Sequence, residues 1–259
     1  MIDPWLRAVI ALPFGLAIGS FMTVVVTRVP AHRSIVSPAS RCPRCQTLLR
    51  TRDNVPILGW LLLRGRCHSC GEPISPLYPV LELTTALLIA GAFWRTSDPW
   101  IAFAVAALLA LMPAVSAIDI AHRIIPNAII YPSLVAFPVF IGVAAVAGAP
   151  VDLFRMAIGF AAFGGGLFVI ALVSGGMGMG DVKLAALIGL VLGALGLRFV
   201  GVAAGAAIAL GGIGAVVALA SGRGRKAAIP FGPYLAAGAV FAAFWGEALA
   251  QRYLDTLAG

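Results

Sequence analysis

Long uncharged apolar runs alternate with short polar segments along most of this chain. The first run covers residues 8–27, and seven more follow a polar stretch, at about 77–94, 99–118, 127–147, 153–173, 182–197, 199–220 and 228–249. A helix needs about 20 apolar residues to cross a bilayer, and these runs are of about that length. Continuous apolar runs favour a helical bundle over the alternating pattern of a β-barrel. The pattern predicts an all-α polytopic membrane protein with eight transmembrane helices.

The boundaries between the runs differ in strength. Arg198 is almost the only residue that separates the sixth run from the seventh, and Pro132 and Pro138 interrupt the fourth. The N-terminal run has no basic cluster ahead of it and no small-residue cleavage site behind it, so we expect a retained span and not a signal peptide. The expected division is a first transmembrane helix at 1–27, a polar domain at 28–75 and a seven-helix membrane domain at 76–259.

Composition agrees with a membrane protein. Hydrophobic residues make up 61% of the chain and charged residues 11%, against about 45–50% and 25% in soluble domains. Alternation from the first span places 13 of the 18 basic residues on the face that carries segments 28–75, 119–126 and 221–227 and the glycine-rich stretch before Asp181. The positive-inside rule makes that face cytoplasmic. Because this distribution accounts for the net charge of +8, we expect lipid and not nucleic acid around the chain.

All four cysteines lie in the polar domain, as two Cys-x-x-Cys pairs separated by 21 residues: Cys42, Cys45, Cys67 and Cys70. Two such pairs can close a tetrahedral zinc site, and a site with four thiolates leaves no position for a catalytic water. The alternative is a pair of disulfides, which a reducing cytoplasm disfavours. We expect structural zinc, with His68 as a solvated residue beside it.

Two aspartates stand at the ends of apolar runs. Asp119 closes the third run, and Asp181 opens the sixth directly after the glycine-rich stretch. Two spans separate them, so both fall on the same face. Two carboxyls held together share a proton and can activate water, which is the chemistry of an aspartic protease. Spacing alone leaves open a simpler alternative, in which Asp181 caps a helix and Asp119 pairs with His122 or Arg123.

The residues around Asp181 fit the catalytic hypothesis. Gly178 and Gly180 have no side chains, which allows a substrate backbone to approach, and Lys183 would set the charge state of Asp181 or anchor the end of its helix. A function of another class is also open. The chain could be a non-enzymatic transporter or an assembly scaffold, with a zinc domain that binds a partner. A proton path normally needs a series of acids inside the spans, and the apolar runs contain no such series.

The chain resembles the type IV prepilin peptidases, polytopic aspartic proteases with a Gly-x-Gly-Asp signature, along nearly its whole length. The residues that carry the resemblance are Gly19-Ser20-Phe21, Arg28-Val29-Pro30, Arg41-Cys42-Pro43, Asp53-Asn54-Val55-Pro56, Trp60, Gly65-Arg66-Cys67, Tyr78-Pro79, Glu82-Leu83, Asp119 with Ile125-Pro126-Asn127, Gly178-Met179-Gly180-Asp181 and Pro230-Phe231-Gly232-Pro233. Gly59 departs from the family, where a serine is expected.

The resemblance implies a bifunctional enzyme of the bacterial inner membrane in a type IV pilus or type II secretion system. Asp119 and Asp181 would cleave the leader from prepilins or pseudopilins at the cytoplasmic face. The new N-terminal residue would then be methylated with S-adenosylmethionine as the methyl donor. No motif identifies the residues that bind this donor, and Glu72, Glu82 and the cysteine-containing loop are candidates only.

Overall fold

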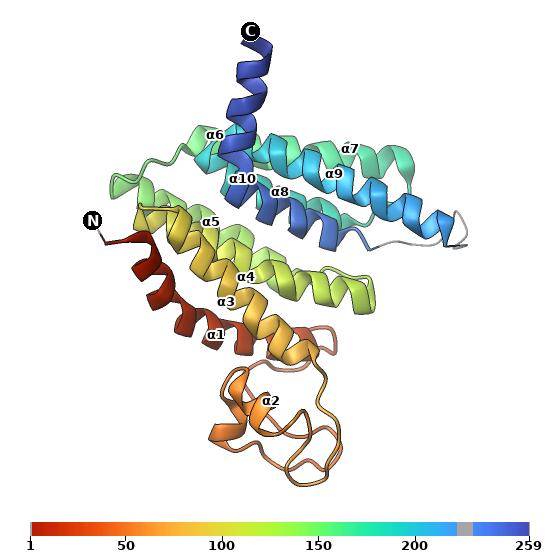
Figure 1. Cartoon of the computed structure of the whole chain (residues 1–259). Coiled ribbons are helices and arrows are strands. Elements are labelled where there is room, and N and C mark those ends of the chain that lie inside the picture. Colours follow the sequence, from red (N-terminus) through yellow and green to blue (C-terminus); the bar gives the residue numbers. More distant parts are fainter. Residues whose placement is uncertain (1, 222–229, 259) are drawn as a thin grey trace.

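The computed structural model describes residues 2–221 and 230–258, and these form a bundle of helices (Figure 1). The described part of the chain contains no strand, only two isolated β-bridges in the cysteine-containing segment. The elements are α1 (Pro4–Arg28), η1 (Thr51–Asn54), α2 (Leu58–Leu62), α3 (Leu77–Arg95), α4 (Pro99–His122), α5 (Asn127–Val146), α6 (Leu153–Gly159), η2 (Phe160–Gly164), α7 (Gly165–Ser174), α8 (Met179–Leu195), α9 (Leu197–Ala220) and α10 (Gly232–Ala258).

The prediction of an all-α multi-pass membrane protein is confirmed. Seven helical segments of the described chain are long and apolar enough to cross a membrane, with α6, η2 and α7 together forming one of them. The segment α8 has 17 residues, slightly fewer than the roughly 20 that a straight span requires. The count of eight spans therefore stays a prediction that depends on α8.

The helices α4 and α8 form the centre of the bundle. Every residue from 184 to 194 in α8 is buried, and α4 contributes a comparable set that includes Leu108, Leu109 and Met112. By contrast α9 is largely exposed, with Val200, Ala203 and Ala207 as its buried residues. Large apolar side chains on outer helices face outward, as is required where lipid replaces water. Residues at the ends of α4 and α8 are therefore placed by the most rigid part of the molecule.

Small residues allow the closest helix contacts. A Cβ on Gly15 would fall 2.7 Å from the Cα of Ala86, and one on Gly19 would fall 2.7 Å from the Cα of Glu82. The face formed by these two glycines therefore packs directly on α3, as their spacing predicts. Between α6 and α8, a Cβ on Gly189 would fall 2.2 Å from the carbonyl oxygen of Gly159. These glycines join helices within one chain.

Three features of the helix boundaries differ from the sequence expectation. The break between α8 and α9 falls at Gly196, with φ 149°, and not at Arg198, because glycine adopts a backbone conformation that side chains disfavour. Arg198 instead forms an ion pair with Glu247 of α10. Asp119 lies one turn inside α4, which continues to His122. The π-helical segment η2 interrupts a span that was expected to be a regular helix.

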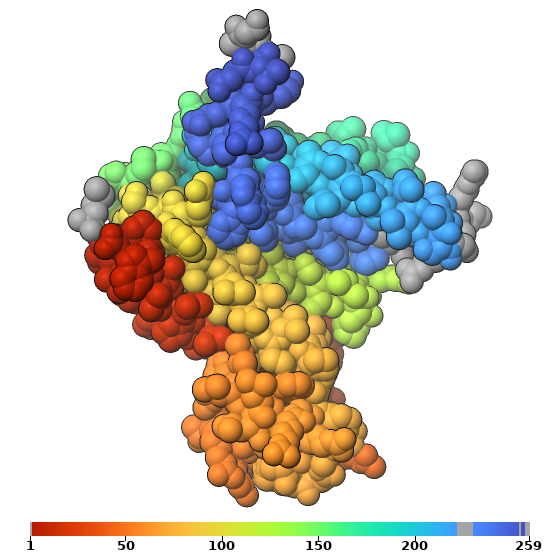
Figure 2. Space-filling view, viewed as in Figure 1, coloured from red at the N-terminus to blue at the C-terminus, as the bar shows by residue number. Residues whose placement is uncertain are grey.

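Topology places the cysteine-containing segment and Asp119 at the same end of the bundle. The helices α3 and α4 pack against each other and are joined by a connection of three residues, 96–98, so they run antiparallel. The beginning of α3 therefore lies beside the end of α4. The segment between α1 and α3 projects from this end (Figure 2). Most of the expected basic loop at 221–227, and the start of the run expected at 228, lie outside the described residues.

The contact between α6 and α8 predicts a test of packing. Gly189→Ala places a methyl group against the backbone of Gly159, and overpacking of this kind costs about 1–3 kcal/mol. We expect a lower midpoint of thermal unfolding in detergent. Gly201→Ala is the matched control, because a Cβ there meets nothing within 4 Å. An equal loss of stability in both variants would contradict the packing account.

Candidate active site

Asp119 is a buried carboxyl at the end of the central helix α4. Its residue is only 4% exposed, and its Oδ2 accepts a hydrogen bond of 2.8 Å from the backbone N–H of Gly232, at the start of α10. A Cβ on Gly232 would fall 2.7 Å from the same oxygen. The absence of a side chain at Gly232 is therefore what brings the amide within reach of the carboxyl. Buried carboxyls are costly unless they are hydrogen-bonded.

Asp181 is the third residue of α8 and is half-buried. The N-cap of this helix is Gly178, with an extended backbone and no capping side chain. The alternative that Asp181 caps the helix is therefore wrong, because the N-cap is Gly178 and Asp181 is the third residue within the first turn. An acid in the first turn still gains from the helix dipole. The neighbouring backbone at Gly178 is open, since a Cβ there would have only Asp181 Oδ2 and the Gly180 nitrogen within 4 Å.

The two aspartates face a shared site at one end of the bundle. Asp119 lies in the last turn of α4, and Asp181 lies in the first turn of α8. A Cβ on Gly180 would fall 2.9 Å from the Cβ of Ile125, so the start of α8 packs on the segment that follows Asp119. Among the described residues Asp119 has no ion pair with His122 or Arg123. The structure thus brings together the pair predicted from the parity of the spans.

Gly180 and Lys183, which were expected to support Asp181, both contact neighbouring parts of the protein. Ile125 occupies the space beside Gly180, so this glycine is required by the packing of α8. Lys183 Nζ donates a hydrogen bond of 3.0 Å to Asn127 Oδ1 and lies 4.7 Å from the centre of the Tyr131 ring. Lys183 therefore joins α8 to α5. This contact favours the anchoring role over a direct effect on Asp181.

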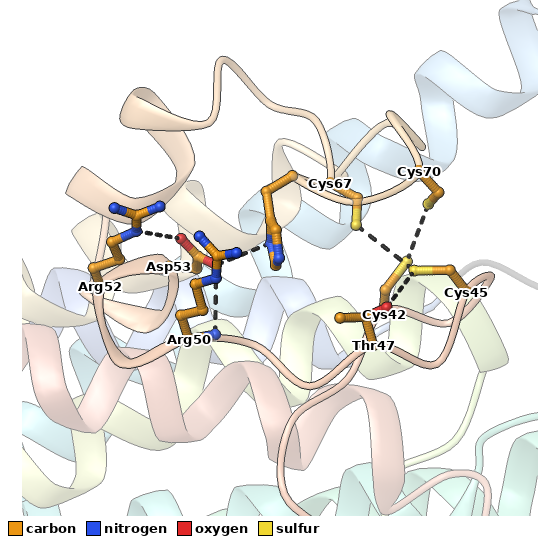
Figure 3. Close-up of polar contacts among 9 residues, drawn as sticks. Cys42, Cys45, Thr47, Arg50, Arg52, Asp53, Cys67 and Cys70 are labelled. Carbon is orange, nitrogen blue, oxygen red and sulfur yellow. Dashed lines mark hydrogen bonds and ion pairs between the residues drawn. The ribbon is translucent and has the colours of Figure 1, made fainter.

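The four cysteines converge on one point from two equivalent loops (Figure 3). Their sulfur atoms all lie within 4.8 Å of one another. Cys42 Sγ is 3.8 Å from Cys70 Sγ, and Cys45 Sγ is 3.9 Å from Cys67 Sγ. The four thiols are free, so the disulfide alternative is not supported. Tetrahedral zinc with Zn–S bonds of about 2.3 Å separates its sulfur ligands by about 3.8 Å. The cluster therefore has the size of a metal site.

The two cysteine loops repeat the same backbone hydrogen bonds. The N–H of Cys42 bonds the Thr47 carbonyl at 3.0 Å, and the N–H of Cys67 bonds the Glu72 carbonyl at 2.8 Å. The residue after each pair, Gln46 or Gly71, has a positive φ and donates back to the first cysteine. Each loop thus turns sharply and presents both sulfurs to the same side.

The loop backbone favours the thiolate form at two cysteines. Hydrogen bonds with the side chain and backbone of Thr47 lower the pKa of Cys45 to about 6. The backbone amides of Cys70 and Ser69 lower the pKa of Cys67. Metals bind cysteine as the thiolate, so both shifts favour a bound cation.

His68 does not lie in solvent, so the expectation of a solvated residue is wrong. Its side chain is 16% exposed, and its Nδ1 lies 3.0 Å from Oδ2 of Asp53, whose side chain is 3% exposed. The Asp53 carboxylate also lies 3.6 Å from Arg52 Nε. These contacts attach the second cysteine loop to η1. No motif in the sequence indicates this pairing, because the two residues are not neighbours along the chain.

Sequence reasoning also did not identify Gly232 as a partner of Asp119. The Pro230–Pro233 segment was noted for its resemblance to a family, but a backbone amide leaves no side-chain signal. Only the fold shows that the start of α10 completes the environment of Asp119.

Two family models match the chain and together cover most of it. The model described as "Bacterial Peptidase A24 N-terminal domain" matches residues 13–96, and the model described as "Type IV leader peptidase family" matches residues 104–219. The first contains the four cysteines, and the second contains both aspartates. The cysteine cluster and the aspartate pair therefore fall in the ranges of two separate family models.

Several relatives align with nearly the full chain. A protein of Bacillus subtilis is 34% identical, over 95% of this chain and 97% of the relative. Proteins of Stutzerimonas stutzeri and Pseudomonas aeruginosa are 31% and 32% identical, over 98% and 93% of this chain and 96% and 91% of theirs. All three are named prepilin leader peptidase/N-methyltransferase. No solved structure matches the chain significantly.

Proposed function

Because this chain belongs to the type IV leader peptidase family, we propose that Asp119 and Asp181 are the catalytic pair with which it cleaves its substrate. The chain is a prepilin leader peptidase with N-methyltransferase activity, like the relatives it matches over nearly their full length. The observation that carries the assignment is that Asp119 near the C-terminal end of α4 and Asp181 near the N-terminal end of α8 lie at the same end of the bundle. Asp119 is also buried there and accepts a hydrogen bond from the Gly232 amide.

The pair supports hydrolysis of an amide bond. One carboxylate takes a proton from a water molecule as the oxygen attacks the scissile carbonyl carbon, and the other carboxyl donates its proton as the amine leaves. The Gly232 amide orients the carboxyl of Asp119, and the open backbone at Gly178 leaves room for an extended peptide. The products are the leader with a new carboxyl end and the mature chain with a free amine.

We place the site at the cytoplasmic face of the bacterial inner membrane. The support is the excess of basic residues in the segments at that end of the bundle, together with the positive-inside rule. The substrates that fit this position are prepilins or pseudopilins, whose leaders precede an apolar helix. The transporter or scaffold alternative is set aside because the chain is an enzyme.

We propose that zinc holds the two cysteine loops together. The sulfur separations match a tetrahedral site, and the segment between α1 and α3 has few buried apolar residues of its own. Small domains of this kind depend on a metal for folding. Since all four ligands are cysteines, the metal has a structural role and does not activate water. The proposed division therefore separates a zinc domain at 28–75 from the membrane helices.

The second activity requires a methyl donor, and S-adenosylmethionine supplies the methyl group for the new N-terminal amine. This step follows cleavage, because the amine is released only then.

The aspartate pair is tested by two isosteric substitutions. Asp119→Asn and Asp181→Asn each remove one carboxyl, and loss of the acid or the base costs about 100-fold or more in rate. We expect each variant to lose leader cleavage by at least that factor, measured on a prepilin substrate in membranes. Glu247→Gln, which changes a carboxyl on α10 outside the site, is the control. Substantial cleavage by either aspartate variant would refute the pair.

Metal content tests the zinc domain. The double variant Cys42→Ser/Cys67→Ser removes one ligand from each loop, so we expect it to lose about one zinc per chain. Elemental analysis of purified protein measures this loss. His68→Ala should retain the metal, because the four sulfurs suffice. A wild-type protein without zinc would overturn the proposal.

A further inference from the structure

A cavity of about 770 Å³ lies between the C-terminal half of α1 and the cysteine-containing segment. Its wall includes Ser20, Val24 and Thr27 on one face of α1, together with Asp53, Asn54, Val55 and Trp60. The start of α3, with Tyr78 and Glu82, also lines it. Small-molecule sites typically enclose about 300–1,000 Å³. The catalytic aspartates do not line this cavity, so it is available for a different ligand.

Three acids line the cavity, and two of them are paired within the protein. Asp53 lies 3.6 Å from the Nε of Arg52, and Glu72 forms an ion pair with Arg44. Glu82 has no ion pair with any cation of the described residues. It is 7% exposed, and its Oε2 accepts a hydrogen bond of 2.7 Å from the Ile57 amide.

The second oxygen of Glu82 has no hydrogen-bond donor among the described side chains and amides. This oxygen is not among the fully buried unpaired polar atoms of the described residues, so it remains accessible from the cavity that Glu82 lines. Glu82 therefore places on the cavity wall a carboxylate that has no ion-pair partner among the described residues. A ligand with a positive charge would complete its environment.

The cavity also offers an aromatic surface and a positive region. The Trp60 indole is held in place by a hydrogen bond of 3.0 Å from Nε1 to the Ile74 carbonyl, and it packs against Gly65. Purine rings stack on such aromatic faces. Arg28, Arg33 and Arg41 line another part of the wall, where a carboxylate would bind.

We propose that this cavity binds S-adenosylmethionine, with Glu82 as the partner of the sulfonium and Trp60 as the platform for the adenine. The lining matches the ligand in chemistry, since one molecule carries a fixed positive charge, a purine and a carboxylate. The arginines would hold the carboxylate. The inference rests on the methyltransferase activity given under the proposed function. It adds the residues that would bind the methyl donor.

Direct binding tests the assignment independently of methylation. The full-length, zinc-loaded protein in nanodiscs of zwitterionic lipid is titrated with S-adenosylmethionine by calorimetry. Glu82→Gln keeps an acceptor for the Ile57 amide but removes the charge, and we expect the dissociation constant to rise by about tenfold or more. Asp3→Asn is the matched control, because it removes an exposed carboxyl that makes no capping hydrogen bond and should bind like the wild type.

A second pair of variants tests the aromatic platform. Trp60→Phe and Trp60→Leu both lose the hydrogen bond to Ile74, but only leucine removes the aromatic face. We expect the phenylalanine variant to retain most of the affinity and the leucine variant to lose about tenfold or more. Zinc content and the unfolding midpoint of each preparation establish that the cysteine loops remain folded.

The outcomes separate this proposal from the proposed function. If the wild type binds the donor and Glu82→Gln and Trp60→Leu bind it equally well, the cavity is not the site, although the enzyme assignment stands. If the wild type neither binds the donor nor methylates a cleaved substrate, the methyltransferase activity itself fails. Binding by the wild type with selective loss in these two variants supports the cavity.

Discussion

The packing of α8 against the end of α4 is the contact on which the proposed active site depends. Gly180 lies against Ile125, and a Cβ there would fall 2.9 Å from that side chain. Lys183 adds a hydrogen bond to Asn127 at the start of α5. These contacts place Asp181 in the first turn of a buried helix beside Asp119. The cost of two carboxyls at such a position is consistent with a catalytic role.

The two functional regions of the molecule are stabilised by different means. Helices that cross a membrane pack through small residues, because burying apolar side chains between helices gains little free energy when lipid is the alternative. Gly19 of α1 packs in this way against α3, and Gly189 of α8 packs against α6. The segment outside the bundle has few buried apolar residues and has a cluster of four sulfurs instead. The cavity between them lies where these two kinds of structure meet, so a ligand there would contact both.

Much of this arrangement could be predicted from the sequence, because it depends on properties that are local in the chain. Apolar runs predict the spans, the Cys-x-x-Cys spacing predicts the cluster, and the parity of the spans places Asp119 and Asp181 together. Other features depend on contacts between distant segments. The burial of His68 against Asp53 and the amide of Gly232 beside Asp119 leave no pattern in the sequence. The break at Gly196 was missed because the charge of Arg198 was the more visible signal.

The central claim is that Asp119 and Asp181 occupy one site, and proximity can be measured without any assay of activity. The variant Asp119→Cys/Asp181→Cys, loaded with zinc to protect the native cysteines, is treated with a short bifunctional thiol reagent and analysed by mass spectrometry. The control is Asp98→Cys/Asp181→Cys, because residue 98 precedes α4 and lies about 30 Å from its other end. The account predicts a cross-link between 119 and 181 and none between 98 and 181. Absence of the first cross-link, or equal yields of both, would contradict it.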